Sequence, residues 1–150
     1  MSLGPLDVRS IIDHLRAAVP ELKFVGGAAD RAAVDDAPTL VTPAAYVILA
    51  SEDVNVTPAT GRPVHRTLAR VDVIYHVRHY RDGQRGAAHQ PELVNLVSLG
   101  RRALNQFVPV APSGAVIEAM SSAGRALLLA LRERDAFWLD PFETTYWGSP

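Results

Sequence analysis

The feature that most constrains the fold is a two-residue alternation over residues 67–79. The odd positions of this segment read Thr, Ala, Val, Val, Tyr, Val and His, and the even positions read Leu, Arg, Asp, Ile, His and Arg. Successive side chains of a β-strand point to opposite faces, so the pattern predicts a strand with one apolar and one mostly polar face. His76 is then expected on the polar face beside Arg78, with His79 capping the strand. The chain should therefore fold around a sheet that is half-buried at this strand.

Two segments with apolar residues at three- and four-residue spacing predict long helices. The first spans residues 5–19 and ends at Pro20, and the second spans residues 91–107, where Pro109 and Pro112 are expected to stop it. A short helical stretch and further strands are expected at residues 28–36, 22–25, 44–50, 126–134 and 137–147, the last two as a terminal hairpin. The apolar run within 44–50 favours burial on both faces of that strand.

This order of elements predicts an α+β fold in a single domain over residues 1–150. We expect a mixed or antiparallel β-sheet of about four to five strands with two long helices packed on it. A chain of 150 residues is long enough to bury one core without covalent staples. Residues 51–63, with two prolines and one glycine, predict a loop or an extended hairpin arm. We expect this arm to be mobile in the isolated subunit and to be ordered by a partner.

The sequence offers no recognisable catalytic or cofactor site. It has no cysteine, which excludes disulfides, thiolate metal sites and cysteine nucleophiles. His76 and His79 would point to opposite faces of a strand, which argues against a metal site with His65. No nucleophile elbow, phosphate-binding loop or dinucleotide fingerprint is present. We therefore expect a non-enzymatic protein without metal or cofactor. The longest apolar stretches, such as residues 126–131, are too short to span a bilayer, and a cytoplasmic product without membrane contact is expected.

The net charge of −1 conceals an asymmetry along the chain. Residues 62–102 carry eight arginines and three acidic residues, a charge of +5, whereas the remainder carries seven basic and thirteen acidic residues, a charge of −6. Fourteen of the fifteen basic residues are arginine, which fits forked hydrogen bonds at interfaces or, equally, a genome with arginine-rich codon usage. Two regions of opposite charge would let one copy pair with a rotated copy.

The charged segment and the aromatic C-terminus supply the candidate interface residues. Arg81 and Arg85 lie in a predicted turn at the end of the long strand, where side chains would project outward. Trp138 and Trp147 fit either core packing or interface anchoring. The neutral total charge argues against a dedicated duplex-binding protein. The full set of interface candidates is Arg62, His65, Arg66, Arg78, Arg81, Arg85, Trp138 and Trp147.

Several local features in order resemble the tail terminator proteins of tailed bacteriophages. They are the helix end at residues 15–20 followed by Val25-Gly26-Gly27, the segment 43–47, the long strand running into residues 81–88, and the closing segments 138–140 and 142–146. Together they cover most of the chain, and none is a catalytic signature.

The resemblance implies a virion protein, made in the cytoplasm of a bacterial host, that forms a ring on the head-proximal end of the tail tube. A homohexamer is the expected ring. It would stop tube polymerisation and contact the tail tube protein, a neck or head-completion protein and, in a contractile tail, the sheath protein. DNA would only pass through the lumen, without sequence-specific binding. The alternatives are another small neck, head-completion or tail structural protein and, from a different class, a small bacterial enzyme or binding module.

Overall fold

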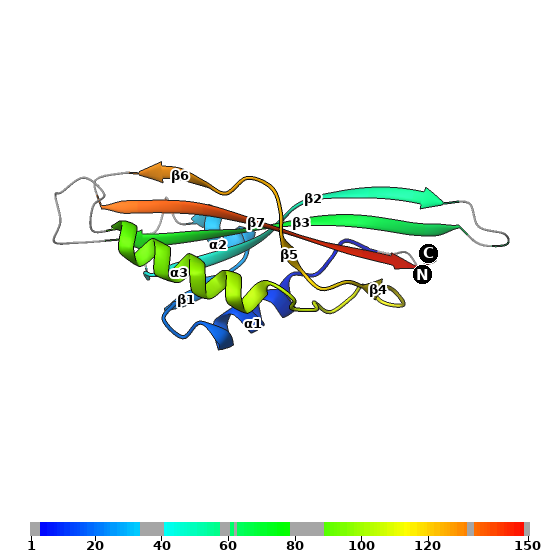
Figure 1. Ribbon diagram of the computed structural model, residues 1–150, viewed down its shortest axis with the longest axis horizontal. Coiled ribbons are helices and arrows are strands. Elements are labelled where there is room, and N and C mark those ends of the chain that lie inside the picture. Colours follow the sequence, from blue (N-terminus) through cyan, green and yellow to red (C-terminus); the bar gives the residue numbers. More distant parts are fainter. Residues whose placement is uncertain are drawn as a thin grey trace.

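Three long antiparallel strands form the body of the molecule (Figure 1). The computed structural model describes residues 4–33, 41–57, 61, 63–78, 89–131 and 134–148. β3 (Val64–Arg78) lies between β2 (Ala44–Thr57) and β7 (Asp135–Gly148), and pairs with β2 over residues 64–76 and with β7 over residues 65–78. The strand predicted from the alternation is β3. It begins three residues earlier than predicted, because its N-terminal end stays paired with both neighbours.

Short strands line the two outer members of this trio. β1 (Phe24–Gly26) pairs in parallel with the start of β2. β4 (Val116–Ile117), β5 (Ser121–Ser122) and β6 (Leu127–Leu131) all pair antiparallel with β7 and follow it along its length. The sheet is therefore mixed, and the terminal hairpin of β6 and β7 is confirmed. Together with its helices it makes the α+β domain that was predicted.

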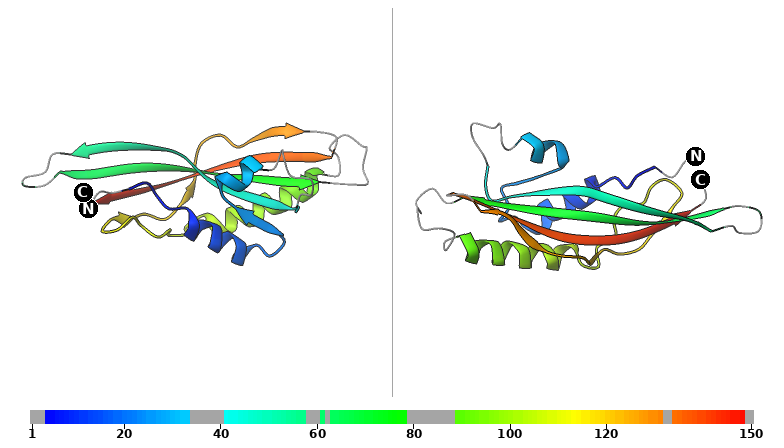
Figure 2. Two further views of the ribbon diagram at one scale, coloured as in Figure 1. Left: turned by 180° about the vertical axis from the view of Figure 1, so that it is seen from behind. Right: turned by 90° about the horizontal axis from the view of Figure 1, so that it is seen from above.

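The sheet has two unlike faces, which we name by what covers them. The helical face carries the odd-numbered residues of β3 and packs against α1 (Arg9–Ala18) and α3 (His89–Leu104), which Figure 1 shows beneath the sheet. The outer face carries the even-numbered residues of β3. The short helix α2 (Ala28–Ala33) lies beside the β1–β2 side of the sheet, as the view from above in Figure 2 shows.

The main core lies between the helical face and the two long helices. Tyr75 from β3, Ile11 and Leu15 from α1, and Leu96 and Leu104 from α3 belong to it and are at most 1% exposed. The strand over residues 44–50 is buried on both faces at its start, as predicted, because Ala44 to Val47 meet α1 on one side and a second apolar cluster on the other.

α1 begins later and α3 ends earlier than predicted, because of hydrogen bonds to residues outside each helix; α3 also begins two residues before the predicted start, at His89. α1 begins at Arg9 rather than residue 5, since the Leu6 N–H donates to the Glu52 carboxylate of β2 (3.2 Å). α3 ends at Leu104, before the prolines. Gln106 adopts a left-handed conformation (φ 72°), and its N–H donates to the Met120 carbonyl (2.9 Å) instead of continuing the helix.

Residues 51–57 of β2 and 64–70 of β3 form a hairpin, here called the arm, which extends beyond the helices (Figure 1). This confirms the hairpin reading of the predicted loop for the residues described; residues 58–60 and 62 lie outside them. The Glu52 carboxylate anchors the base of the arm, because it accepts a hydrogen bond from the Tyr146 hydroxyl (2.7 Å) as well as from Leu6. Mobility of the arm stays a prediction.

Candidate assembly interface

The structure describes five of the eight predicted interface residues and distributes them over both faces and both ends of the sheet. Arg62, Arg81 and Arg85 lie outside the described residues. Trp138 and Trp147 occupy opposite ends of β7 and opposite faces of the sheet, since Trp138 pairs with Tyr75 and Trp147 with Arg66. Two of the candidates do come together.

The arm brings Arg66 next to Trp147 on the outer face. The two residues are cross-strand partners, and Asn55 of β2 is the partner of Arg66 on its other side. Arg66 is exposed, while Trp147 and the neighbouring His65 are half-buried. His65 points to the helical face of the arm, opposite Val56. An exposed guanidinium beside a partly exposed indole is a composition enriched at protein interfaces.

Arg78 is held inside its own subunit. Its guanidinium donates two hydrogen bonds to the Asp135 carboxylate, from Nε to Oδ1 (2.7 Å) and from Nη2 to Oδ2 (2.9 Å). Burial tends to raise the pKa of Asp135, but the hydrogen bonds from Arg78 and His76 outweigh it, so the pKa lies below its usual value. A forked pair of this kind is strong and directional. Arg78 therefore stabilises the start of β7 within the subunit.

His76 shares a face with Arg78, as predicted, but that face is not solvated there. The imidazole is fully buried, stacks on Phe137 (centroids 4.2 Å apart) and donates from Nε2 to Asp135 (2.7 Å). The Arg31 guanidinium of α2 lies over the other end of this stack, 4.7 Å from the Phe137 ring. The outer face is apolar here because Tyr46 and Ile74 also lie on it. The alternation missed this second cluster, since only one of its apolar residues, Ile74, lies in β3.

The burial of His76 predicts acid-sensitive folding. Burial disfavours the imidazolium and lowers the pKa of His76, despite the opposing effect of Asp135; Arg78 and Arg31 add repulsion. The unfolded chain takes up this proton near pH 6.5, and the folded chain only at lower pH. The contribution of neutral His76 to the free energy of unfolding is therefore fully present above pH 6.5. It falls, by at most about 1.4 kcal/mol per pH unit, as the pH drops from 6.5 to the pKa of His76 in the folded chain. Asp135, whose pKa is lowered, adds a further loss below pH 3.8.

His76→Phe should flatten the dependence of unfolding free energy on pH between 7 and 5. Phenylalanine keeps the stack on Phe137 but removes the titrating group. Denaturant unfolding at several pH values would measure this. The difference in unfolding free energy between the variant and the wild-type protein at pH 8, where His76 is neutral, reports the lost hydrogen bond separately. An unchanged slope in the variant would show that His76 is not the source.

A second arginine of the basic segment is also neutralised internally. Asp140 of β7 is 1% exposed and accepts hydrogen bonds from Arg101 of α3, from Nη2 at 2.6 Å and from Nε at 3.0 and 3.1 Å. Arg78 and Arg101 thus pair with carboxylates from the acidic remainder of the same chain. Within the basic segment, residues 62–102, three exposed arginines form no ion pair in the part of the chain that is described, namely Arg66, Arg70 and Arg102. The charge available between subunits is therefore smaller than the sequence sums indicate.

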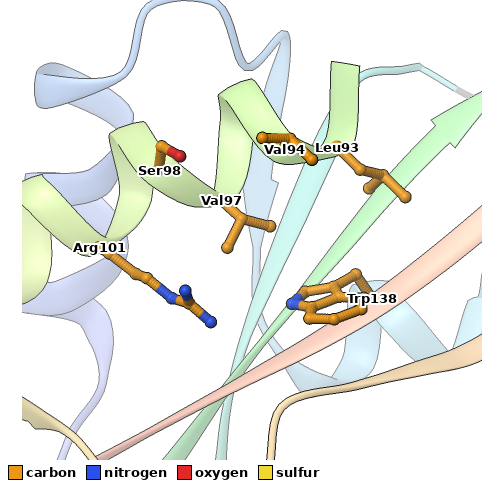
Figure 3. A pocket seen from close by; sticks show the side chains of 6 residues that line it. All are labelled: Leu93, Val94, Val97, Ser98, Arg101 and Trp138. Carbon is orange, nitrogen blue, oxygen red and sulfur yellow. The ribbon is translucent and has the colours of Figure 1, made fainter. Parts of the chain in front are cut away.

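Trp138 lines a largely apolar hollow of about 260 Å³ between α3 and β7. Figure 3 shows Trp138 facing Val97 and Arg101 across this space, with Leu93, Val94 and Ser98 along the helix. Val94 is 60% exposed at the rim. Among the described residues that line the hollow, Arg101 is the only charged one, so they offer no acid–base pair. Its shape and apolar lining suit contact with another chain better than chemistry.

The apolar surface continues from this hollow onto β6, at the edge of the sheet. Leu127, Leu128, Leu129 and Leu131 are all exposed, between 37% and 50%. Leu128 is the cross-strand partner of Trp138 and so lies on the helical face beside the hollow. The sequence analysis predicted this strand but not the exposure of its leucines. Its composition was the available signal, because four leucines in five residues without alternation are typical of a strand covered on both faces. β6 pairs on one side only within the described residues, so its apolar surface is left uncovered in the single chain.

The opposite edge of the sheet is also open, along β2 beyond the short β1. The arm portion of β2 exposes Val54 and Val56 on the helical face, each 55% exposed, and Asp53 on the outer face. The two edges differ in chemistry. β2 contains two acidic and no basic residues, whereas residues 123–131 contain Arg125 and no acidic residue. Open strand edges are the usual sites at which sheets pair with other chains.

The described residues contain no group of three or more histidine, aspartate or glutamate side chains close enough to hold a metal ion. None of the helices seen in the described ranges has the length and apolar character needed to cross a membrane.

Comparison with known proteins agrees with the fold and with the resemblance. The model of the phage tail terminator protein family matches residues 1–148. A search of curated proteins finds no match. Among solved structures, a chain from the virion of the native gene transfer agent (GTA) particle has a TM-score of 0.50 and 17% identity, covering 89% of this chain and 84% of that chain. At this identity the likeness supports the fold alone. Because the family model spans nearly the whole sequence, the protein belongs to the phage tail terminator family, a family of structural, non-enzymatic virion proteins.

Proposed function

We propose that this protein forms a closed ring, expected to be a hexamer, on the head-proximal end of a tail tube. There it stops the addition of tube subunits and presents a surface to a neck or head-completion protein. The observation that carries the proposal is the family match over residues 1–148. The non-enzymatic character of the family agrees with it, since termination requires binding and shape rather than catalysis.

The two open sheet edges support a ring on physical grounds. A ring needs a heterologous contact, in which two different patches of each subunit meet and the rotation closes. The β2 edge is acidic with exposed valines, and the β6 edge is leucine-rich with a nearby arginine. Unlike patches on opposite sides of one sheet suit head-to-tail contact better than a two-fold dimer.

The proposed partners are the tail tube protein on one side of the ring, the neck or head-completion protein on the other, and a sheath protein if the tail is contractile. DNA is expected to pass through the lumen without sequence readout. The near-zero net charge supports this view, because strong duplex binding depends on many phosphate contacts.

The position of the protein on the tube can be tested directly. Tubes are assembled from the cognate tail tube protein, mixed with the gold-labelled chain and imaged by electron microscopy. We expect label at one end of each tube. Label along the tube wall, or no label at either end, would contradict the proposal.

A further inference from the structure

We propose that neighbouring subunits join by pairing their sheet edges, the free edge of β2 (residues 51–57) of one copy against β6 (Leu127–Leu131) of the next. The proposal deepens the ring function above and rests on it for the number of copies. It commits both open edges of the sheet to a second copy of this chain.

The first support is the unsatisfied apolar surface on β6. Its four exposed leucines and the hollow beside Trp138 form one apolar area over two faces and an edge. A monomer rarely leaves such an area in water, and a leucine-rich open edge invites pairing with another chain. The exposed Val54 and Val56 give the β2 edge apolar side chains that could lie against it.

The second support is charge complementarity. Asp53 is exposed on β2 and Arg125 is exposed just before β6, and neither has an ion-pair partner among the residues the structure describes. Glu52 is already occupied by Tyr146 and Leu6, which leaves Asp53 as the carboxylate available on this edge. Contact between like edges would bring together either two acidic strands or two strands flanked by arginine. Complementary charge therefore favours contact between unlike edges.

The third support is strand direction. β2 runs antiparallel to β3, β3 to β7, and β7 to β6, so β2 and β6 point in opposite senses. A rotation that carries one subunit onto the next keeps these senses. β6 of one copy and β2 of the next then meet antiparallel, which continues the pattern of the long strands. The free edges also lie toward opposite ends of the sheet (Figure 2), so joined subunits would be staggered along the strands, as strands are in closed sheets.

The absence of cysteine allows a clean cross-linking test. Asn55→Cys places a thiol on the exposed β2 edge and Leu129→Cys places one on β6; both side chains are exposed, so folding should be unaffected. We expect a disulfide-linked pair, or one bridged by a short bis-maleimide, when the two variants are mixed, and none from either variant alone. Ala17→Cys, exposed on α1, is the matched control and should not link to Asn55→Cys.

Each other outcome is informative. Linkage of Leu129→Cys to itself would show a two-fold β6 contact and overturn the proposal, as would the absence of linkage in the mixture, which would leave these edges to the tube or neck protein. The double variant Asn55→Cys/Leu129→Cys separates this inference from the ring function. A ladder of linked species that stops at one size supports both. A ladder without a limit supports edge pairing but contradicts a closed ring. If the double variant forms rings of the same size as the wild-type protein but shows no linkage, edge pairing is rejected and the ring function is not.

Discussion

Gly100→Ala is expected to destabilise the fold by about 2–3 kcal/mol, although alanine is favoured over glycine in a helix interior by about 1 kcal/mol. A Cβ atom on Gly100 of α3 would lie 1.7 Å from the hydroxyl oxygen of Tyr75 and 2.9 Å from Cζ. Tyr75 is fully buried in the main core, so it could move aside only by displacing its packed neighbours. The glycine thus lets α3 approach the sheet closely.

The same contact predicts a rescue. The Tyr75 hydroxyl is buried without a hydrogen-bond partner among the described residues, so Tyr75→Phe should be neutral or up to about 1 kcal/mol stabilising. Combining it with Gly100→Ala removes the closest clash and should recover part of the loss. Asn95→Ala, at an exposed position of α3, serves as the control. Denaturant unfolding measures all four variants. A loss of equal size with and without the Tyr75 hydroxyl would contradict the explanation.

Arg101→Met should cost about 2–3 kcal/mol, whereas Asp140→Asn should cost only about 1 kcal/mol. The asymmetry follows from exposure, since the side chain of Asp140 is 2% exposed and that of Arg101 is 45% exposed. Removing the arginine strands a buried carboxylate. Removing the charge of the aspartate leaves a guanidinium that water can solvate. Methionine keeps most of the apolar stem, so lost packing contributes little.

Thermal or denaturant unfolding of the two variants at pH 7 measures this difference. The double variant Arg101→Met/Asp140→Asn should be more stable than Arg101→Met alone, because it no longer buries an unpaired charge. Equal losses in the two single variants would indicate that the pair acts as an ordinary surface ion pair.

The sequence predicted the sheet because its signals are local. The alternation that defines β3 and the apolar run at the start of β2 each reflect which side chains face the core within one strand. Composition left open whether residues 51–63 form a loop or a hairpin, and for residues 51–57 the pairing of β2 with β3 beyond the bulge between Leu49 and Ser51 shows a hairpin strand. The ends of α1 and α3 were misplaced because they depend on hydrogen bonds that Leu6 and Gln106 donate to Glu52 and Met120, which are distant in the sequence.

The candidate interface was less accessible from the sequence. The charge count along the sequence treated Arg78 and Arg101 as part of a basic region available for an interface. Both are paired within the subunit, with carboxylates of β7 that lie 57 and 39 residues away in the sequence. The exposure of β6 depends on its position at the edge of the sheet, which composition alone does not reveal. Arg66 and Trp147 were each named as interface candidates, but their position as cross-strand partners follows only from the register of β3 and β7. Candidate residues could be named one at a time from the sequence, whereas their pairings could not.

The measurement that tests termination most directly is the growth of tail tubes in the presence of the protein. Tube protein is polymerised, the chain is added in small molar excess over tube ends, and tube length is followed by electron microscopy and light scattering. We expect elongation to stop at the time of addition and to resume only at ends that carry no ring. Continued elongation at the rate seen without the protein, with the chain nevertheless bound to the tubes, would contradict its role as a terminator.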